Sequence, residues 1–203
     1  MKSVKNVIIS IAMVAILLVG GAFAYLTDSD TATNILTVGN VEIELTEPSF
    51  DGNAAKDLYA GEVVAKDPTV KNTGTNDAYV YLMVTVPKAD VVVTDAEGNK
   101  QASRVQNLFT YTVNSGWTLI ESDEADTSAS RYVYAYDTRV ASNASTNALF
   151  NNVTLVNVIE GQISSNEELK VVIDAYAIQA DFTTAKTPAE AWAVCVNQNE
   201  IVL

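Results

Sequence analysis

The sequence of 203 residues contains no histidine, a single cysteine, and only 12 basic residues against 25 acidic ones. Without histidine, the chain cannot form the imidazole-based zinc sites of familiar metalloproteases, nor a Ser-His-Asp or Cys-His catalytic group. A lone cysteine excludes a disulfide within the chain. The net charge of −13 argues against a nucleic-acid or anionic-lipid ligand. These absences disfavour an enzyme and favour a structural or binding protein.

Two of these features, the lone cysteine and the excess of acidic residues, can each be interpreted in two ways. Cys195 is expected to be a buried small apolar residue, although it also offers a cross-link between two chains. The acidic residues are expected to form a solvated surface, while solubility during export and cation bridging between subunits are the functional alternatives.

The N-terminus has the three parts of an export signal. Lys2 and Lys5 form a positive region, an apolar run covers Val7 to Val19, and Ala22-Phe23-Ala24 fits an A-x-A cleavage pattern. We therefore predict a signal peptide, with its N-terminal signal helix, over residues 1–24 and cleavage between Ala24 and Tyr25. All 25 acidic residues follow this point, so the mature chain becomes more acidic.

An alternative keeps this segment as a membrane anchor. The stretch from Val7 to Leu26 is almost uninterrupted apolar sequence and is just long enough to span a bilayer. The small residues from Gly20 to Ala24 suit the extended substrate of a signal peptidase better than the end of a spanning helix. Cleavage is therefore the preferred interpretation.

The mature sequence predicts an all-β protein, a jelly-roll-like antiparallel β-sandwich that forms a single domain over residues 41–203. Val41, Ile43 and Leu45 alternate with polar residues at the period of a strand. Further strands are expected at 63–71, 78–86, 91–94, 108–113, 117–121, 131–136, 153–158 and 169–180.

Two of these expectations concern strand pairing. The segments 63–71 and 78–86 are expected to form a hairpin-like pair around a turn at Asn72-Thr73-Gly74-Thr75, where glycine tolerates a positive φ and the asparagine caps its own backbone. The segment 169–180 begins with a continuous apolar run, which is typical of a central, buried strand.

One short helix is expected near the C-terminus. Thr187-Pro188-Ala189-Glu190 forms a capping box with proline at the first helical position, so the helix should run from Pro188 to about Val196. It carries Trp192 and Cys195 and is expected to pack on one end or face of the sandwich.

No group of side chains indicates catalysis, and no cofactor or metal is predicted. The densest acidic cluster, Glu121 to Asp126, is expected at a solvated hairpin tip, because it lacks the glycine and spacing of an EF-hand calcium loop. Tyrosines recur on the expected strands and should serve the core and its edges rather than bind carbohydrate or a neighbouring subunit. These are Tyr79, Tyr81, Tyr111, Tyr132, Tyr134, Tyr136 and Tyr176.

Three segments resemble the TasA/camelysin family of secreted biofilm-matrix fibre proteins, which a SipW-type signal peptidase processes. They are the Ala-Tyr-Leu-Thr-Asp exit after the signal, the strand from Gly39 to Leu45, and the block from Leu58 to Val86, in which Ala60 stands where relatives often have proline. The resemblance implies a secreted protein of the extracellular matrix or cell surface. Its partners would be copies of itself, the signal peptidase and other matrix proteins, with no nucleic acid.

The resemblance also implies a mode of assembly. Cleavage would free residues 25–40 as a donor and linker segment, whose first part inserts into a groove of the next subunit as an added strand. The candidate donor residues are Tyr25, Leu26, Thr27, Asp28, Ser29, Asp30, Thr31, Ala32 and Thr33. The alternative is a monomeric surface adhesin or binding module held by an uncleaved anchor. Camelysin-type relatives are described as metalloproteases, an activity that we do not expect from a chain without histidine.

Overall fold

The longest strand, β4 (Ala78–Val91), is buried on both of its faces from Ala78 to Val84. In the computed structural model, which describes residues 39–163, 169–181, 185–199 and 201, alternate residues of β4 point to opposite sides. Val80, Leu82 and Val84 belong to the core between two layers, whereas Tyr79 and Tyr81 belong to a second core on the outer face. Because neither face meets water over residues 78–84, the strand is continuously apolar there instead of alternating.

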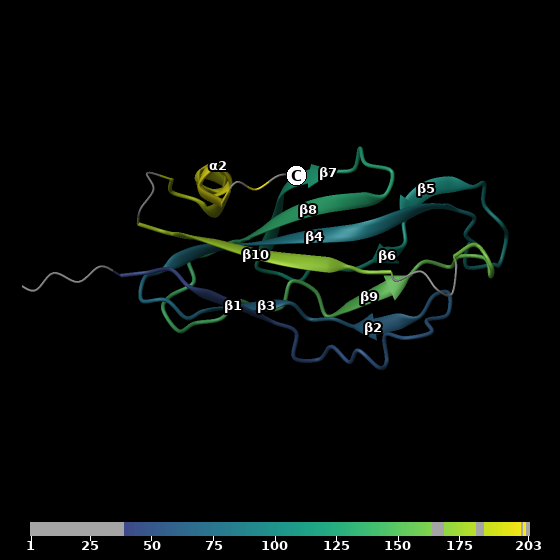
Figure 1. The fold of residues 1–203 in the computed structure, drawn as a ribbon, viewed down its shortest axis with the longest axis horizontal. Helices are drawn as coiled ribbons and strands as arrows, with labels where there is room; N and C mark the ends of the chain where they lie inside the picture. Colours follow the sequence, from purple (N-terminus) through teal and green to yellow (C-terminus); the bar gives the residue numbers. More distant parts are fainter. Residues whose placement is uncertain (1–38, 164–168, 182–184, 200, 202–203) are drawn as a thin grey trace, which may run out of the picture. The chain divides into compact units, whose positions relative to one another are not determined.

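Two antiparallel layers enclose the first core, as Figure 1 shows. The larger sheet has the order β10-β4-β8-β7, and β5 pairs with the far end of β4. Its strands are β10 (Val172–Gln179), β8 (Ala129–Tyr136), β7 (Trp117–Asp123) and β5 (Arg104–Asn107). The opposite layer contains the pair β1-β3 and the sheet β2-β9-β6. Its strands are β1 (Ile43–Thr46), β3 (Thr69–Asn72), β2 (Val63–Ala65), β9 (Asn152–Leu155) and β6 (Phe109–Thr110).

This architecture confirms the predicted all-β, jelly-roll-like antiparallel sandwich with a short helix near its C-terminus. The predicted signal helix lies outside the described residues. Within the described part of the chain, no helix is long and apolar enough to cross a membrane.

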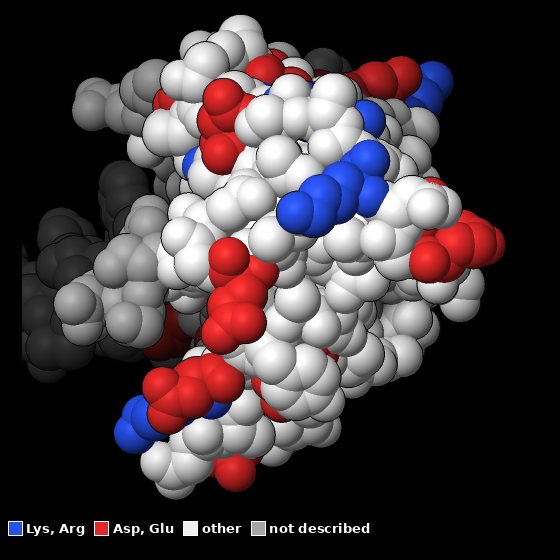
Figure 2. Space-filling view, turned by 90° about the vertical axis from the view of Figure 1, so that its right-hand side faces the viewer, with Lys and Arg blue, Asp and Glu red and all other residues white. Residues whose placement is uncertain are grey.

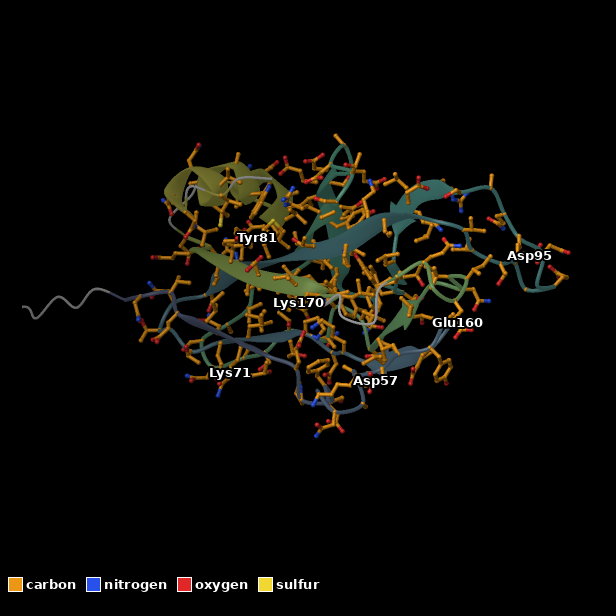
Figure 3. The ribbon with its side chains drawn as sticks, turned by 45° about the vertical axis from the view of Figure 1, so that its right-hand side comes forward. Asp57, Lys71, Tyr81, Asp95, Glu160 and Lys170 are labelled. Carbon is orange, nitrogen blue, oxygen red and sulfur yellow. The ribbon has the colours of Figure 1, made fainter. Side chains whose placement is uncertain are left out.

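Helix α2 (Pro188–Asn199) covers the outer face of the larger sheet. The indole of Trp192 stacks obliquely on Tyr81, with ring centroids 4.9 Å apart, and its Nε1 donates a hydrogen bond to the Glu121 carboxylate on β7. The Tyr81 hydroxyl, which lies beneath the helix in Figure 3, donates to the Pro188 carbonyl at 2.7 Å. The helix therefore closes the second core and connects β4 to β7.

A β-bulge on β7 makes the contact with Trp192 possible. The register between β7 and β8 shifts between Leu119 and Glu121, so that Glu121 lies opposite Val133. Val133 faces the second core, and residues directly opposite each other in an antiparallel pair share a face. The extra residue thus brings the Glu121 carboxylate to the side of the sheet that α2 covers.

The capping box predicted for α2 is present, with one difference. Thr187 Oγ1 accepts a hydrogen bond from the Glu190 amide at 3.3 Å, while the Glu190 carboxylate accepts from the Lys186 amide, one residue before the cap. The helix continues to Asn199 rather than ending near Val196. The Asn199 side chain donates to the Cys195 carbonyl at 2.9 Å in this last turn.

The predicted strand at 63–71 is wrong, because the chain forms two strands there that belong to different sheets. Pro68 has no amide hydrogen for a ladder. The neighbouring Asp67 carboxylate accepts hydrogen bonds from the Ser49 amide and hydroxyl, both at 2.8 Å, which holds the break. The expected hairpin is also wrong, since β3 pairs with β1 and β4 pairs with β10 and β8. Residues 73–77 therefore carry the chain from one layer to the other.

The side chain of Asn72 holds this crossing. It is fully buried, its Nδ2 donates to the carbonyls of Asn76 and Val140 at 2.8 and 2.9 Å, and its Oδ1 accepts from the Gly74 amide at 3.0 Å. The asparagine cap is thus as predicted. Gly74, however, is not at a positive φ. A Cβ there would lie 2.6 Å from the Asn40 carbonyl oxygen, so the glycine permits close approach of the backbone that precedes β1.

Strand β10 is not central, contrary to the prediction for 169–180. It pairs only with β4 in the described part of the chain and therefore forms an end of the larger sheet. Strand β5 was not predicted, because its four residues, Arg-Val-Gln-Asn, carry no alternation that separates them from a loop. The segments 91–94 and 108–113 contain fewer strand residues than predicted. Val91 is the last residue of β4, and within 108–113 only Phe109–Thr110 forms a strand, β6.

Replacement of Asn72 by alanine should destabilise the fold by about 2–4 kcal/mol, because buried backbone groups lose their hydrogen-bond partner. Chemical denaturation followed by tryptophan fluorescence measures the change. Asn53 is exposed in the loop before β2, and the matched change Asn53→Ala should cost less than about 0.5 kcal/mol. Equal losses for the two variants would contradict the role assigned to Asn72.

The Cys195 thiol should be inert in the native protein. The residue is fully buried, and burial raises its pKa from 9.0 to about 11, so the reactive thiolate is scarce near neutral pH. Disulfide reagents should label it only after denaturation. Because the thiol loses its proton more readily in the unfolded chain, this group should also lower stability as the pH rises from 9.0 to about 11.

Cys195→Ala with Thr127→Cys is the control, since Thr127 is exposed at the β7–β8 tip and its replacement should react at once in the native state. Rapid labelling of native Cys195 would show that the second core opens readily.

Candidate functional site

The residues that the sequence singles out for processing and assembly all precede the described part of the chain. Ala22, Ala24 and Tyr25 at the predicted cleavage point, and the donor segment from Tyr25 to Thr33, lie outside the described residues. The structure does define where the chain after this segment joins the domain. The Asn40 amide donates to Thr75 Oγ1 at 3.0 Å, and the Asn40 carbonyl accepts from the Thr75 amide at 3.1 Å. Asn40, near the start of the described chain, is thus bonded to the turn that Asn72 holds.

The described residues offer no metal centre. Among them, no group of three or more histidine, cysteine, aspartate or glutamate side chains could hold a metal ion. The acidic cluster at 121–126 lies at the end of the β7–β8 hairpin, as predicted. Two of its carboxylates serve the turn: Asp123 accepts from the Ala125 amide, and Asp126 from the Ser128 amide and hydroxyl. The Glu121 carboxylate instead accepts from Trp192 of α2. Hydrogen bonds from Ser128 lower the pKa of Asp126, so this carboxylate stays charged.

The tyrosines act mainly in packing, as predicted. Tyr79, Tyr81 and Tyr134 are buried, and the hydroxyls of Tyr111 and Tyr134 are hydrogen-bonded at 3.1 Å. Burial raises the pKa of both Tyr111 and Tyr134, so neither hydroxyl acts as an acid or base near neutral pH. The side chains of Tyr132, Tyr136 and Tyr176 are partly buried and pack against one of the two cores.

Surface charge also gives no concentrated binding patch on the face drawn in Figure 2. There, separate carboxylates and basic groups are dispersed among uncharged side chains. This pattern is typical of a solvated surface rather than of a site that attracts a highly charged ligand.

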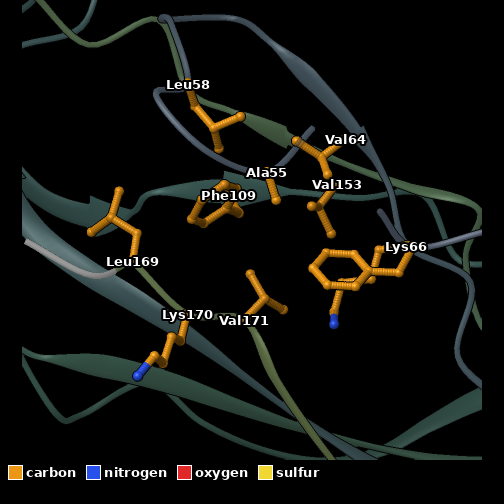
Figure 4. A pocket seen from close by; sticks show the side chains of 10 residues that line it. Ala55, Leu58, Val64, Lys66, Phe109, Val153, Leu169, Lys170 and Val171 are labelled. Carbon is orange, nitrogen blue, oxygen red and sulfur yellow. The ribbon is translucent and has the colours of Figure 1, made fainter. Parts of the chain in front are cut away.

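An apolar cavity of about 160 Å³ lies between the opposite layer and the segment that leads into β10. Figure 4 shows the apolar side chains around it, among them Phe109 and Val153 of the opposite layer and Leu169 and Val171 before β10. Its lining residues are Phe50, Ala55, Leu58, Val64, Lys66, Phe109, Val153, Leu169, Lys170 and Val171.

The two lysines do not make this cavity a polar site. Lys66 Nζ lies 2.7 Å from the Glu47 carboxylate and 5.0 Å from the centre of the Phe50 ring, so its charge is already compensated. The ammonium group of Lys170 points away from the opening in Figure 4. The cavity therefore suits an apolar group, and it has no nucleophile or acid–base pair for a reaction.

A second, more polar hollow of about 240 Å³ lies at the other end of β10. It is lined by residues 39–41, by Ala177, Ile178 and Gln179 at the end of β10, and by Gln198 of α2. Gly39, the first described residue, thus lies close to the C-terminal end of β10.

Sequence reasoning did not identify the cavity, because its lining comes from segments far apart in the chain. Two signals point toward it. Phe50 and Leu58 are apolar residues in a polar loop, and Leu169 and Val171 continue the apolar pattern of β10 before that strand begins pairing.

Comparison with known proteins gives one match. The family model of the camelysin metallo-endopeptidases matches residues 1–174, whereas no curated protein and no solved structure matches the chain. The family's name implies a catalytic metal, but the residues present do not fit one: the whole chain lacks histidine, and the described residues hold no cluster of other ligands. The match nevertheless spans most of the sequence, so the chain belongs to the TasA/camelysin family.

Proposed function

We propose that this protein is a secreted structural subunit of an extracellular matrix fibre, and that it assembles by inserting its mature N-terminal segment into the next subunit. The observation that carries the proposal is the family match over residues 1–174, a range that includes the predicted export signal and the segment that follows it. The domain supports it because its polar and aromatic groups serve packing, turns and hydrogen bonds within the fold.

The residues that the chain lacks also favour a structural role over a catalytic one. The usual neutral-pH general base and the usual zinc ligand are both histidine, which is absent. The lining of the apolar cavity includes no carboxylate, cysteine or tyrosine that could pair with a lysine as acid and base. We therefore propose a role without peptidase activity, despite the name of the family.

Head-to-tail growth follows from the use of two different surfaces. A segment at one point of the subunit binds a groove elsewhere on the next, so the contact is heterologous and each addition leaves a new groove available. Main-chain hydrogen bonds of an added strand would supply much of the affinity. Cleavage after Ala24 would be the step that makes this segment available.

The second candidate is a monomeric surface adhesin or binding module that keeps its N-terminal anchor. The length of the apolar run from Val7 to Leu26 favours it. Mass spectrometry of the exported protein separates the two candidates: a mature N-terminus at Tyr25 supports the fibre subunit, and an intact Met1 supports the anchored module.

Deletion of Tyr25 to Thr33 should abolish filaments, because the domain loses the segment that joins it to the next subunit. Retention of the signal peptide should have the same effect. Negative-stain electron microscopy and sedimentation measure assembly, with the chain that begins at Tyr25 as the control. The melting temperature of the deletion variant should match that of the control, since β1 begins well after the deleted residues. Normal filaments from the deletion variant would contradict the proposal.

A further inference from the structure

The apolar cavity beside the start of β10 has a buried floor and a partly exposed wall. We propose that it is a binding site for a small uncharged molecule that consists of one aromatic ring or one branched hydrocarbon chain. The site belongs to the folded domain and does not depend on the proposed fibre function.

The strands of the opposite layer close the floor of the cavity. Val64 of β2, Phe109 of β6 and Val153 of β9 line it and are all buried. The wall is less complete, because Phe50 lines the cavity although 42% of its surface is exposed. Four further apolar lining residues are only partly buried, namely Ala55, Leu58, Leu169 and Val171. A bound apolar molecule would cover surface that the fold leaves open to water, which is favourable.

The loop between β1 and β2, residues 47–62, forms part of this wall and is fixed at both ends. At its start, the Glu47 carboxylate lies 2.7 Å from Lys66 Nζ. Near its end, the Gly61 amide donates to the Leu155 carbonyl at 3.0 Å. The loop contains only turns and bends, and loops of more than roughly 12–15 residues without secondary structure are uncommon and usually functional. Because the fixed ends hold the loop in place before a ligand arrives, binding requires little ordering.

The volume of the cavity limits the size of the ligand. It measures about 160 Å³, close to the roughly 150 Å³ of an apolar protein cavity that stays dry and binds benzene. One six-membered ring or a branched chain of similar volume would fill it. A sugar of that size would bury hydroxyl groups against apolar side chains, which is costly without hydrogen-bond partners.

The charges near the cavity favour an uncharged ligand. The lining includes no carboxylate, and the Lys66 ammonium is already paired with Glu47. The ammonium group of Lys170 points away from the opening (Figure 4). A charged ligand would therefore enter an apolar site without a counter-ion, and burial of an unpaired charge is costly. The net charge of −13 opposes an anion further.

Toluene is a suitable probe, since it has one uncharged ring. It should raise the melting temperature of the chain that begins at Tyr25, because a ligand that binds only the folded state stabilises that state. Saturation-transfer NMR measures its affinity and remains usable if the chain assembles. Benzoate and benzylammonium carry the same ring with a charge, and each should bind at least tenfold more weakly than toluene.

Two neighbouring alanines provide matched variants. Ala55 lines the cavity, whereas Ala54 is exposed and does not. Ala55→Leu should occupy the space and weaken toluene binding at least tenfold, and Ala54→Leu should bind toluene like the parent chain. Melting temperatures without ligand show whether both variants fold.

A variant that enlarges the cavity tests the same site through a gain. Leu58→Ala removes side-chain atoms from the wall, and part of the space should persist because the surroundings of such a site relax only partially. The affinity for naphthalene relative to toluene should therefore rise at least tenfold in this variant. A change of preference in this direction does not arise from a loss of stability.

Absence of toluene binding in the parent chain, or equal loss in Ala54→Leu and Ala55→Leu, would overturn the inference. Tighter binding of benzoate than of toluene would overturn the uncharged class of ligand, since a lysine would then recognise an anion. An unchanged preference in Leu58→Ala would contradict the location of the site. Filament formation is a separate measurement, so each of these results leaves the proposed function intact.

Discussion

The fold depends on the burial of β4 on both faces. Its inner residues pack between the layers and its outer residues pack beneath α2, so one strand belongs to both cores. Strand β4 is buried over its first half, whereas the outer strands β7 and β10 of the same sheet are partly exposed. Trp192 extends this arrangement by joining the helix to Tyr81 on β4 and Glu121 on β7. Loss of the helix would expose the most aromatic part of the central strand.

Local sequence patterns predicted those elements that depend mainly on residues close together in the chain. Alternation placed β1, the apolar run placed β4, and Thr187 and Glu190 placed the start of α2. The break between β2 and β3 could have been found from Pro68, but their separation into different sheets depends on long-range pairing. The edge position of β10 could not be predicted, because an apolar run describes what a strand needs to bury and not which partner buries it.

The same distinction limits prediction of the candidate site. The cavity is formed by segments between Phe50 and Val171, and only the folded chain brings them together. The resemblance to the TasA/camelysin family singled out the N-terminal segment as the candidate for assembly. The family match over residues 1–174 supports the assignment of the chain to that family.

The buried turn at Asn72 has a mechanical consequence for a fibre built in this way. Tension applied along the filament would enter each subunit through Gly39 and Asn40, which are bonded to Thr75. The Asn72 side chain continues that path by bonding Asn76 and the Val140 carbonyl. Pulling force would thus pass from a single peptide chain into several hydrogen bonds of the domain, because the Asn40 and Asn72 bonds join the start of the described chain to the turn that Asn72 holds and to Val140.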